Sequence, residues 1–136
     1  MGEATKDYHK TIKSSPDNVS EVEAFIDQLR QEDLIDEQAY GNILISLTEA
    51  VNNAILHGNK SDESKNVDIT CKLNDNMVSF IVSDEGAGFD FNSLPDPTDP
   101  ANVEKLTGRG VFLMKQLSDY VIFSNNGSTV ELQFKV

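Results

Sequence analysis

The sequence predicts an α/β (α+β) two-layer sandwich, in which a mixed, mainly antiparallel sheet is covered on one face by helices. Strand-like segments occur in two pairs joined by short turn-forming stretches, which is the pattern of β-hairpins. Segments with apolar residues every three or four positions, typical of helices with one buried face, precede and separate these pairs. The chain has 136 residues, so we expect a single domain over residues 1–136.

The first two expected elements are an edge strand and a helix. Residues 8–14 alternate loosely between apolar and polar, and the turn-forming residues 15–18 then end the strand. We expect Ser20 or Asn18 to cap the helix that follows, and this helix to end near Glu32. Its apolar residues have helical spacing: Val22, Phe25, Ile26 and Leu29.

The longest expected element is a second helix, which begins at about Asp36 and ends at Gly58, because glycine favours helix termination. Its apolar stripe repeats every three or four residues: Ile43, Leu44, Leu47, Val51, Ala54 and Ile55. His57 lies in the last turn, where it is expected to bind unpaired carbonyl groups of the helix end rather than to act in catalysis.

The first expected hairpin follows this helix. Residues 67–73 alternate in the manner of a strand with one buried face, and a second strand covers residues 77–83. Residues 74–76, Asn-Asp-Asn, form the connection. The single cysteine, Cys71, has no partner for a disulfide and is expected to be a small buried residue of the first strand.

The second hairpin lies at the end of the chain, behind a long loop and a third helix. The loop covers residues 84–107 and is longer than compact domains usually contain, so we interpret it as a lid. The third helix is expected over 110–117. Strands over 121–123 and 129–136 are joined by Asn-Asn-Gly at 125–127.

Charge and composition exclude several classes of function. The formal net charge is −12 and the isoelectric point is about 4.4, which argues against nucleic acid and anionic membranes as partners. No apolar run is long enough to span a membrane, and the first six residues have no secretion signal, so we expect a cytoplasmic protein. Two distant histidines and one cysteine leave no pattern for structural zinc.

Glu49 and Asn53 are candidate functional residues of the long helix. They are four residues apart, so both side chains project from one face, separate from the apolar stripe. Their oxygens suit Mg²⁺, and the carboxylate is able to polarise a neighbouring hydroxyl group or water. Taken alone, the pair equally fits a solvated helix face.

Two glycine-containing segments accompany this pair. Asp84 follows a strand and is followed by Gly86 and Gly88, so its carboxylate can accept a hydrogen bond from the adenine amino group while backbone approaches the base closely. Residues 107–110, Thr-Gly-Arg-Gly, open a helix, and the N–H groups of such a turn form an anion site. A plain turn between loop and helix is the alternative for 107–110.

Taken in order, these features resemble the N, G1 and G2 boxes of the GHKL (Bergerat-fold) ATPases. The likeness runs from about Leu47 to Val136 and is strongest to the anti-sigma factor serine kinases of bacterial sporulation and general stress control. Residues 48–59, 84–89 and 107–114 carry it. The resemblance implies a Bergerat-type ATP-binding fold with a long ATP lid, and a single GHKL domain.

The resemblance also implies roles for individual residues. Asn53 would be the Mg²⁺ ligand and would help bind the nucleotide, and Glu49 would be the general base. Asp84 would bind adenine, and Gly86 and Gly88 would allow its close approach.

The remaining roles concern the phosphates and the far side of the base. Thr107, Gly108, Arg109 and Gly110 would lie at the phosphates, although this chain lacks the basic residue that some members have just before the first glycine. Thr129, in the segment that matches the family's Gly-Thr pair, would help hold adenine. An exposed arginine and an ordinary strand threonine are the alternatives for Arg109 and Thr129.

The function implied is that of an ATP- and Mg²⁺-dependent serine/threonine protein kinase. It would phosphorylate a STAS-type anti-sigma factor antagonist, sequester a sigma factor to regulate transcription, and form a homodimer. An alternative is an ATP-binding regulatory interaction module without kinase activity. The ATP-binding half of a sensor histidine kinase is disfavoured because about 40 residues precede the long helix, too few for paired dimerisation helices. An ATP-hydrolysing clamp would need further domains.

Overall fold

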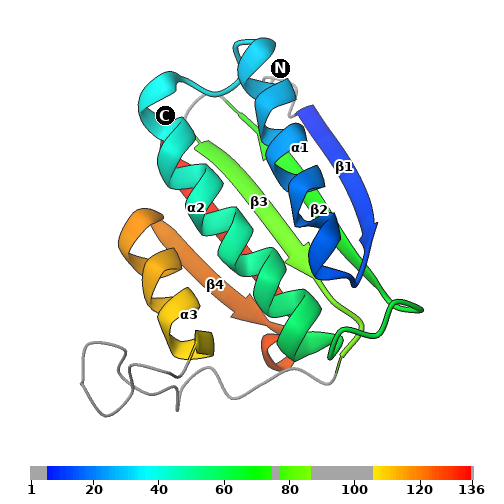
Figure 1. Cartoon of the computed structure of the whole chain (residues 1–136). Coiled ribbons are helices and arrows are strands. Elements are labelled where there is room, and N and C mark those ends of the chain that lie inside the picture. Colours follow the sequence, from blue (N-terminus) through cyan, green and yellow to red (C-terminus); the bar gives the residue numbers. More distant parts are fainter. Residues whose placement is uncertain (1–5, 75–76, 87–105, 136) are drawn as a thin grey trace.

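The computed structural model describes residues 6–74, 77–86 and 106–135, and its strands and helices form two layers. Figure 1 shows helices α1, α2 and α3 on one face of a sheet of five strands. The strands are β1 (Lys6–Lys13), β2 (Asn66–Leu73), β3 (Met77–Ser83), β4 (Tyr120–Ser124) and β5 (Thr129–Lys135). The helices are α1 (Ser20–Gln31), α2 (Glu37–Asn53) and α3 (Leu106–Leu117).

The sheet has the strand order β1-β2-β3-β5-β4, and its four pairings are all antiparallel. The α/β two-layer class and the position of β1 at an edge are therefore confirmed, and no parallel pairing occurs among the described strands. The two hairpins are β2–β3 and β4–β5, as expected. The second hairpin turns through Asn125 and Gly127, whose φ angles are 51° and 92°.

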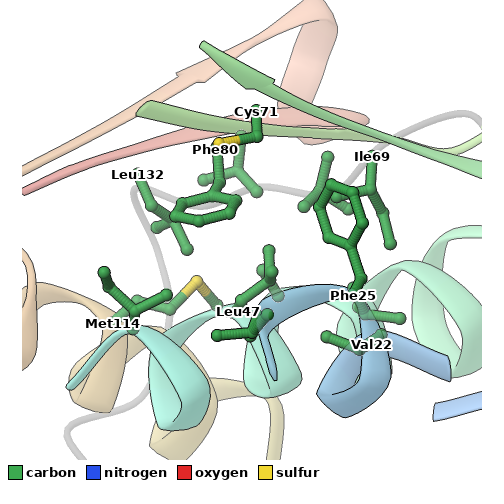
Figure 2. Close-up of a cluster of buried hydrophobic side chains, with 14 of the residues drawn as sticks. Val22, Phe25, Leu47, Ile69, Cys71, Phe80, Met114 and Leu132 are labelled. Carbon is green, nitrogen blue, oxygen red and sulfur yellow. The ribbon is translucent and has the colours of Figure 1, made fainter. Parts of the chain in front are cut away.

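The core lies between the helix layer and the sheet. Figure 2 shows side chains from α1, α2, α3 and the strands meeting there, among them Phe25, Leu47 and Phe80. Phe80 and Phe134 pack edge to face with ring centroids 6.2 Å apart. Cys71 is fully buried in this core, as expected. Fully burying a side chain the size of leucine contributes about 1.5–3 kcal/mol, so this layer of contacts fixes α2 against the sheet.

The N-terminus of α1 differs from the prediction. A short 3-10 turn (Pro16–Val19) runs directly into the helix, and the residue before the helix, Val19, already has helical dihedral angles. A side-chain cap needs an extended residue at this position, so neither predicted cap forms. Ser20 Oγ instead donates to the carbonyl of Asp17, and Asn18 Nδ2 donates to the carbonyl of Lys13.

Helix α2 begins and ends close to the predicted positions. Asp36 caps it, because the carboxylate accepts the N–H of Ala39 at 2.8 Å. The α-helical hydrogen bonding ends at Asn53, and a π-helical turn (Ala54–Gly58) continues to the predicted glycine. Such turns are frequent at functional sites. No helix in the described ranges is long and apolar enough to cross a membrane.

Helix α3 begins at Leu106, four residues before the predicted start at Gly110. The segment 107–110 therefore lies inside the first turns of the helix instead of preceding it. Two glycines in this segment disfavour a helix by about 1 kcal/mol each, which is why the sequence predicted a later start. Contacts of α3 with α2 outweigh this local preference, as the close approach of Gly110 described below shows.

Candidate functional site

A partly open cavity lies between α2, α3 and the adjoining ends of β3, β4 and β5, and the empty space within it, part of which is open to solvent, is about 310 Å³. Its lining is largely apolar: Ala50, Ala54, Val82, Met114, Phe123 and Val130. Asn53 and Asp84 add polar side chains to this lining. An apolar cavity with a few convergent polar groups is the usual construction of a site for a small molecule.

Asp84 reaches the cavity because it directly follows β3. Its N–H donates to the carbonyl of Ser128 at 2.9 Å, which continues the pairing of β3 with β5 by one residue. Its Oδ1 accepts the N–H of Gly86 at 2.8 Å. Burial raises the pKa of the Asp84 carboxyl above its ordinary value, while the Gly86 N–H and the charge of Lys65 act in the opposite direction. Because this carboxyl group is partly buried, a ligand that donates a hydrogen bond to it would stabilise its charged form.

Two glycines allow the strand end and the helix end to approach each other. A side chain on Gly58 would overlap the carboxyl group of Asp84, and one on Gly86 would overlap the carbonyl of Gly58. In the described part of the chain, Gly86 thus packs closely against Gly58. The sequence interpretation gave Gly58 only a role in ending the helix, and Gly88 lies outside the described residues.

Glu49 and Asn53 come together with the first turns of α3. A Cβ placed on Gly110 would lie 3.0 Å from Glu49 Oε2 and 3.2 Å from Asn53 Nδ2, so the glycine backbone faces both side chains. Asn53 Nδ2 is buried and has no hydrogen-bond partner in the described part of the chain. Leaving a buried donor unpaired costs about 1–3 kcal/mol, so a ligand that accepts its hydrogen bond is favoured here.

The backbone at the start of α3 adds an electrostatic contribution. Thr107, Gly108 and Arg109 lie in α3 just before Gly110, so their peptide N–H groups belong to the positive end of the helix dipole. Helix N-termini bind phosphate and other anions for this reason. The start of α3 and the pair on α2 are therefore brought together at Gly110.

Comparison with known proteins identifies the family. Residues 12–134 match the family model of the histidine kinase-like ATPase domain. The chain belongs to this family.

Members of named function resemble this histidine kinase-like ATPase domain over part of their length. The serine-protein kinase RsbW of Bacillus subtilis is 34% identical over 98 residues, which cover 67% of this chain and 61% of that protein. The anti-sigma F factor of Geobacillus kaustophilus is 35% identical over 118 residues, which cover 82% of this chain and 77% of that protein. The serine-protein kinase RsbW of Oceanobacillus iheyensis is 29% identical, and its match covers 57% of that protein. The chain thus spans about three fifths of the length of the two kinases.

One predicted site residue of the domain lies away from the cavity. Successive residues of a strand face opposite sides of the sheet, and Val130 faces the cavity, so Thr129 faces the other side. Thr129 Oγ1 lies 3.1 Å from Ser83 Oγ and accepts a hydrogen bond from Asn125 Nδ2. Ser128, in the turn just before β5, lines the cavity instead. It lies outside the strand and has helical dihedral angles, so strand periodicity could not have identified it.

The donor set of the domain fits Mg²⁺ bound together with phosphates. Glu49 and Asn53 offer a carboxylate and a carboxamide oxygen, which are ligands that Mg²⁺ accepts. Among the described residues, no group of three or more histidine, cysteine, aspartate or glutamate side chains is placed to hold a metal ion. Mg²⁺ keeps several waters and takes one or two protein ligands beside substrate phosphates, so the carboxamide oxygen of Asn53 would suffice as its protein ligand.

Proposed function

We propose that this chain is an ATP-dependent serine/threonine protein kinase that acts as an anti-sigma factor. It phosphorylates a STAS-type anti-sigma factor antagonist and regulates transcription by sequestering a sigma factor. One observation carries the catalytic part of the proposal: the Glu49 carboxylate, the unpaired Asn53 amide and the start of α3 meet beside the cavity that holds Asp84. The names of the relatives support the choice of substrate and partner.

In this proposal the cavity binds the adenine of ATP. Asp84 accepts a hydrogen bond from the exocyclic amino group, and the apolar lining covers the faces of the base. The close backbone approach at Gly86, together with Gly88, keeps the base edge next to Asp84. Ser128 takes the place that the sequence suggested for Thr129.

The phosphates then extend from the cavity to the start of α3. The peptide N–H groups at Thr107, Gly108, Arg109 and Gly110 bind phosphate oxygens, and Arg109 neutralises charge on the γ-phosphate. Asn53 holds Mg²⁺, which when bound neutralises charge on the phosphate oxygens. The unpaired Asn53 Nδ2 supports a hydrogen-bond acceptor, such as a phosphate oxygen, at this point.

Glu49 is the general base of the transfer. Its carboxylate takes the proton of the substrate serine hydroxyl, the serine oxygen forms a bond to the γ-phosphorus, and the bond from the γ-phosphorus to the bridging oxygen breaks to release ADP. Glu49 lies against Gly110, at the end of the proposed phosphate site, which is where such a base is needed. Positioned base catalysis contributes about 10²–10⁴-fold in rate.

The partners and assembly follow from the family rather than from the described contacts. An antagonist protein supplies the serine, a sigma factor is the regulated partner, and the active form is a homodimer. The net charge of −12 suits a basic segment of the sigma factor. Nucleic acid and membrane are not partners in this proposal, and the protein acts in the cytoplasm as one domain over 1–136.

Intact-mass measurement of phosphoserine tests the proposal. The protein is incubated with Mg-ATP and STAS-type candidate antagonists, with Glu49→Gln in parallel and Glu32→Gln as the matched control, because Glu32 is an exposed glutamate at the end of α1. We expect transfer by the wild type and by Glu32→Gln, and a loss of at least 10²-fold in Glu49→Gln with ATP binding retained.

Two results would contradict parts of the proposal. Full transfer by Glu49→Gln would remove the base assignment. Stabilisation by Mg-ATP without transfer to any candidate would favour the alternative, an ATP-binding interaction module. A hundredfold excess of ATP over its dissociation constant should raise the free energy of unfolding by about 2.7 kcal/mol, which a thermal melt detects.

A further inference from the structure

Asn59 is a fully buried polar residue directly after the π-helical turn, and only 1% of its surface is exposed. Its side chain makes three hydrogen bonds. Nδ2 donates to Ser14 Oγ at 2.6 Å and to the carbonyl of Asn66 at 3.0 Å. Oδ1 accepts the N–H of Glu85 at 2.8 Å. The residue therefore connects the end of α2 with three other segments of the chain.

The two hydrogen bonds that Asn59 donates and the one that it accepts connect it to different segments of the chain. The donated bonds go to the ends of β1 and β2, where Ser14 Oγ also donates to the carbonyl of Lys65 at 2.8 Å. The accepted bond goes to the peptide between Asp84 and Glu85, at the proposed base-binding carboxylate. The Glu85 carboxylate in turn accepts the N–H of Asn66. Both arms therefore meet at Asn66, whereas the bond to Ser14 belongs to the donated arm alone, so the effect of that bond can be measured separately.

Three consecutive peptide N–H groups set the conformation around Asp84. The N–H of Asp84 donates to the carbonyl of Ser128, that of Glu85 to Asn59 Oδ1, and that of Gly86 to Asp84 Oδ1. Only the middle bond depends on a side chain from another segment. Asn59 also directly follows Gly58, which packs against the Asp84 carboxyl. Through its hydrogen bond to Glu85 and its peptide link to Gly58, Asn59 therefore holds both segments that meet at this contact.

We infer that Asn59 is a positioning residue for base recognition: through the Glu85 peptide and Gly58 it holds the Asp84 carboxylate in the direction from which it reads the exocyclic amino group. The inference rests on the proposed nucleotide site. Asn59 does not line the cavity and touches no part of the base, so its effect is on selectivity between bases rather than on a contact of its own.

Nucleotide selectivity separates positioning from stability. The full chain is titrated with ATP and with purine riboside triphosphate, which lacks the 6-amino group, and the ratio of the two dissociation constants is the readout. In the wild type ATP should bind about tenfold more tightly or better, because a hydrogen bond to a charged group is worth a factor of this size. In Asn59→Leu, which keeps the approximate volume and removes all three bonds, the ratio should fall to within about twofold of one.

Ser14→Ala is the matched control. It removes the bond from Asn59 to Ser14 and the bond from Ser14 Oγ to the carbonyl of Lys65, and it leaves the bond to Glu85 in place, so it should lower the melting temperature and keep the selectivity. If Asn59→Leu does not fold, Asn59→Ala replaces it, since a smaller side chain admits water to the vacated polar groups.

The outcomes distinguish the inference from the function on which it rests. If the wild type binds neither nucleotide, the proposed function fails. If the wild type discriminates and the Asn59 variants discriminate equally well at a lower melting temperature, Asn59 is only structural and the inference is overturned. Equal loss of selectivity in Ser14→Ala would also overturn it, because general loosening would then explain the effect.

Discussion

Replacing Gly110 by alanine should stabilise the protein and weaken its proposed phosphate site. Inside a helix alanine is favoured over glycine by about 0.8–1 kcal/mol. The new Cβ would lie 3.0 Å from Glu49 Oε2 and 3.2 Å from Asn53 Nδ2, which is too close for an undisturbed contact. Both neighbours are the far ends of flexible side chains, so a small shift relieves the crowding. We expect a net gain of about 0.5 kcal/mol, or about 2 °C in melting temperature.

The same shift should reduce activity. It moves the proposed base and the proposed Mg²⁺ ligand together, and a misplacement of about 1 Å in a catalytic group can cost about 10²-fold. A displacement of a fraction of this size predicts a loss of about tenfold in phosphoryl transfer. Binding of Mg-ATP should weaken as well, because Asn53 is one of the two groups that move.

Gly41→Ala is the control for this experiment. Gly41 lies in α2, is exposed, and has no atom within 4 Å of a Cβ placed on it. It should therefore show the full helix gain of about 1 kcal/mol and leave transfer and ATP binding unchanged. Thermal melts and a transfer assay on the two variants compare both quantities. Unchanged transfer in Gly110→Ala would refute the argument that Gly110 sets the positions of Glu49 and Asn53.

Three further predictions concern the cavity. Asn53→Ala should remove the Mg²⁺-dependent part of ATP affinity. Titrations of this variant in the presence of Mg²⁺ and of EDTA should then give ATP dissociation constants within about twofold of each other. A persistent difference would place the ion elsewhere. Asp84→Asn should raise the melting temperature of the nucleotide-free protein at pH 7 and abolish selectivity for adenine. Because burial raises the pKa of Asp84, the folded state keeps this proton to a higher pH than the unfolded state does. The contribution of this carboxyl to the free energy of unfolding therefore falls as pH rises above the ordinary aspartate range, and the gain in Asp84→Asn should shrink toward pH 4; a gain independent of pH would contradict this. Ser128→Val should weaken ATP binding, whereas Thr129→Val, on the other face of the sheet, should change it less than twofold; the reverse order would restore Thr129 as the adenine residue.

The sequence predicted the elements of the fold well because their signals are local. Strand alternation and helical spacing depend only on neighbours along the chain, and the strands lie within about two residues of the expected positions, as does α2 when the π-helical turn that continues it is included. The errors occur where contacts between distant segments decide. Helix α3 begins before its glycines because α2 packs against Gly110, and α1 lacks its expected cap because the preceding turn is already helical.

For the candidate site, too, the features that depend on neighbouring residues could be predicted, and those that depend on contacts between distant segments could not. The sequence could place Glu49 beside Asn53 because a spacing of four puts two residues on one helix face, and it could place Asp84 directly after a buried strand. The contacts of Gly58 and Asn59 with this region were missed because they depend on how closely the end of α2 approaches the residues after β3. A pattern of neighbouring residues in the sequence does not reveal how close these two segments come.

The residues around the cavity carry costs that simple substitutions would remove. Gly110 costs about 1 kcal/mol of helix stability relative to alanine, and the unpaired Asn53 amide costs about 1–3 kcal/mol. Asp84 holds a carboxylate where burial opposes its charge. Native domains are stable by only about 5–15 kcal/mol, so costs of this size are large. Their concentration at one cavity is the pattern expected of a binding site, because local rules of folding are broken mainly where a ligand compensates for them.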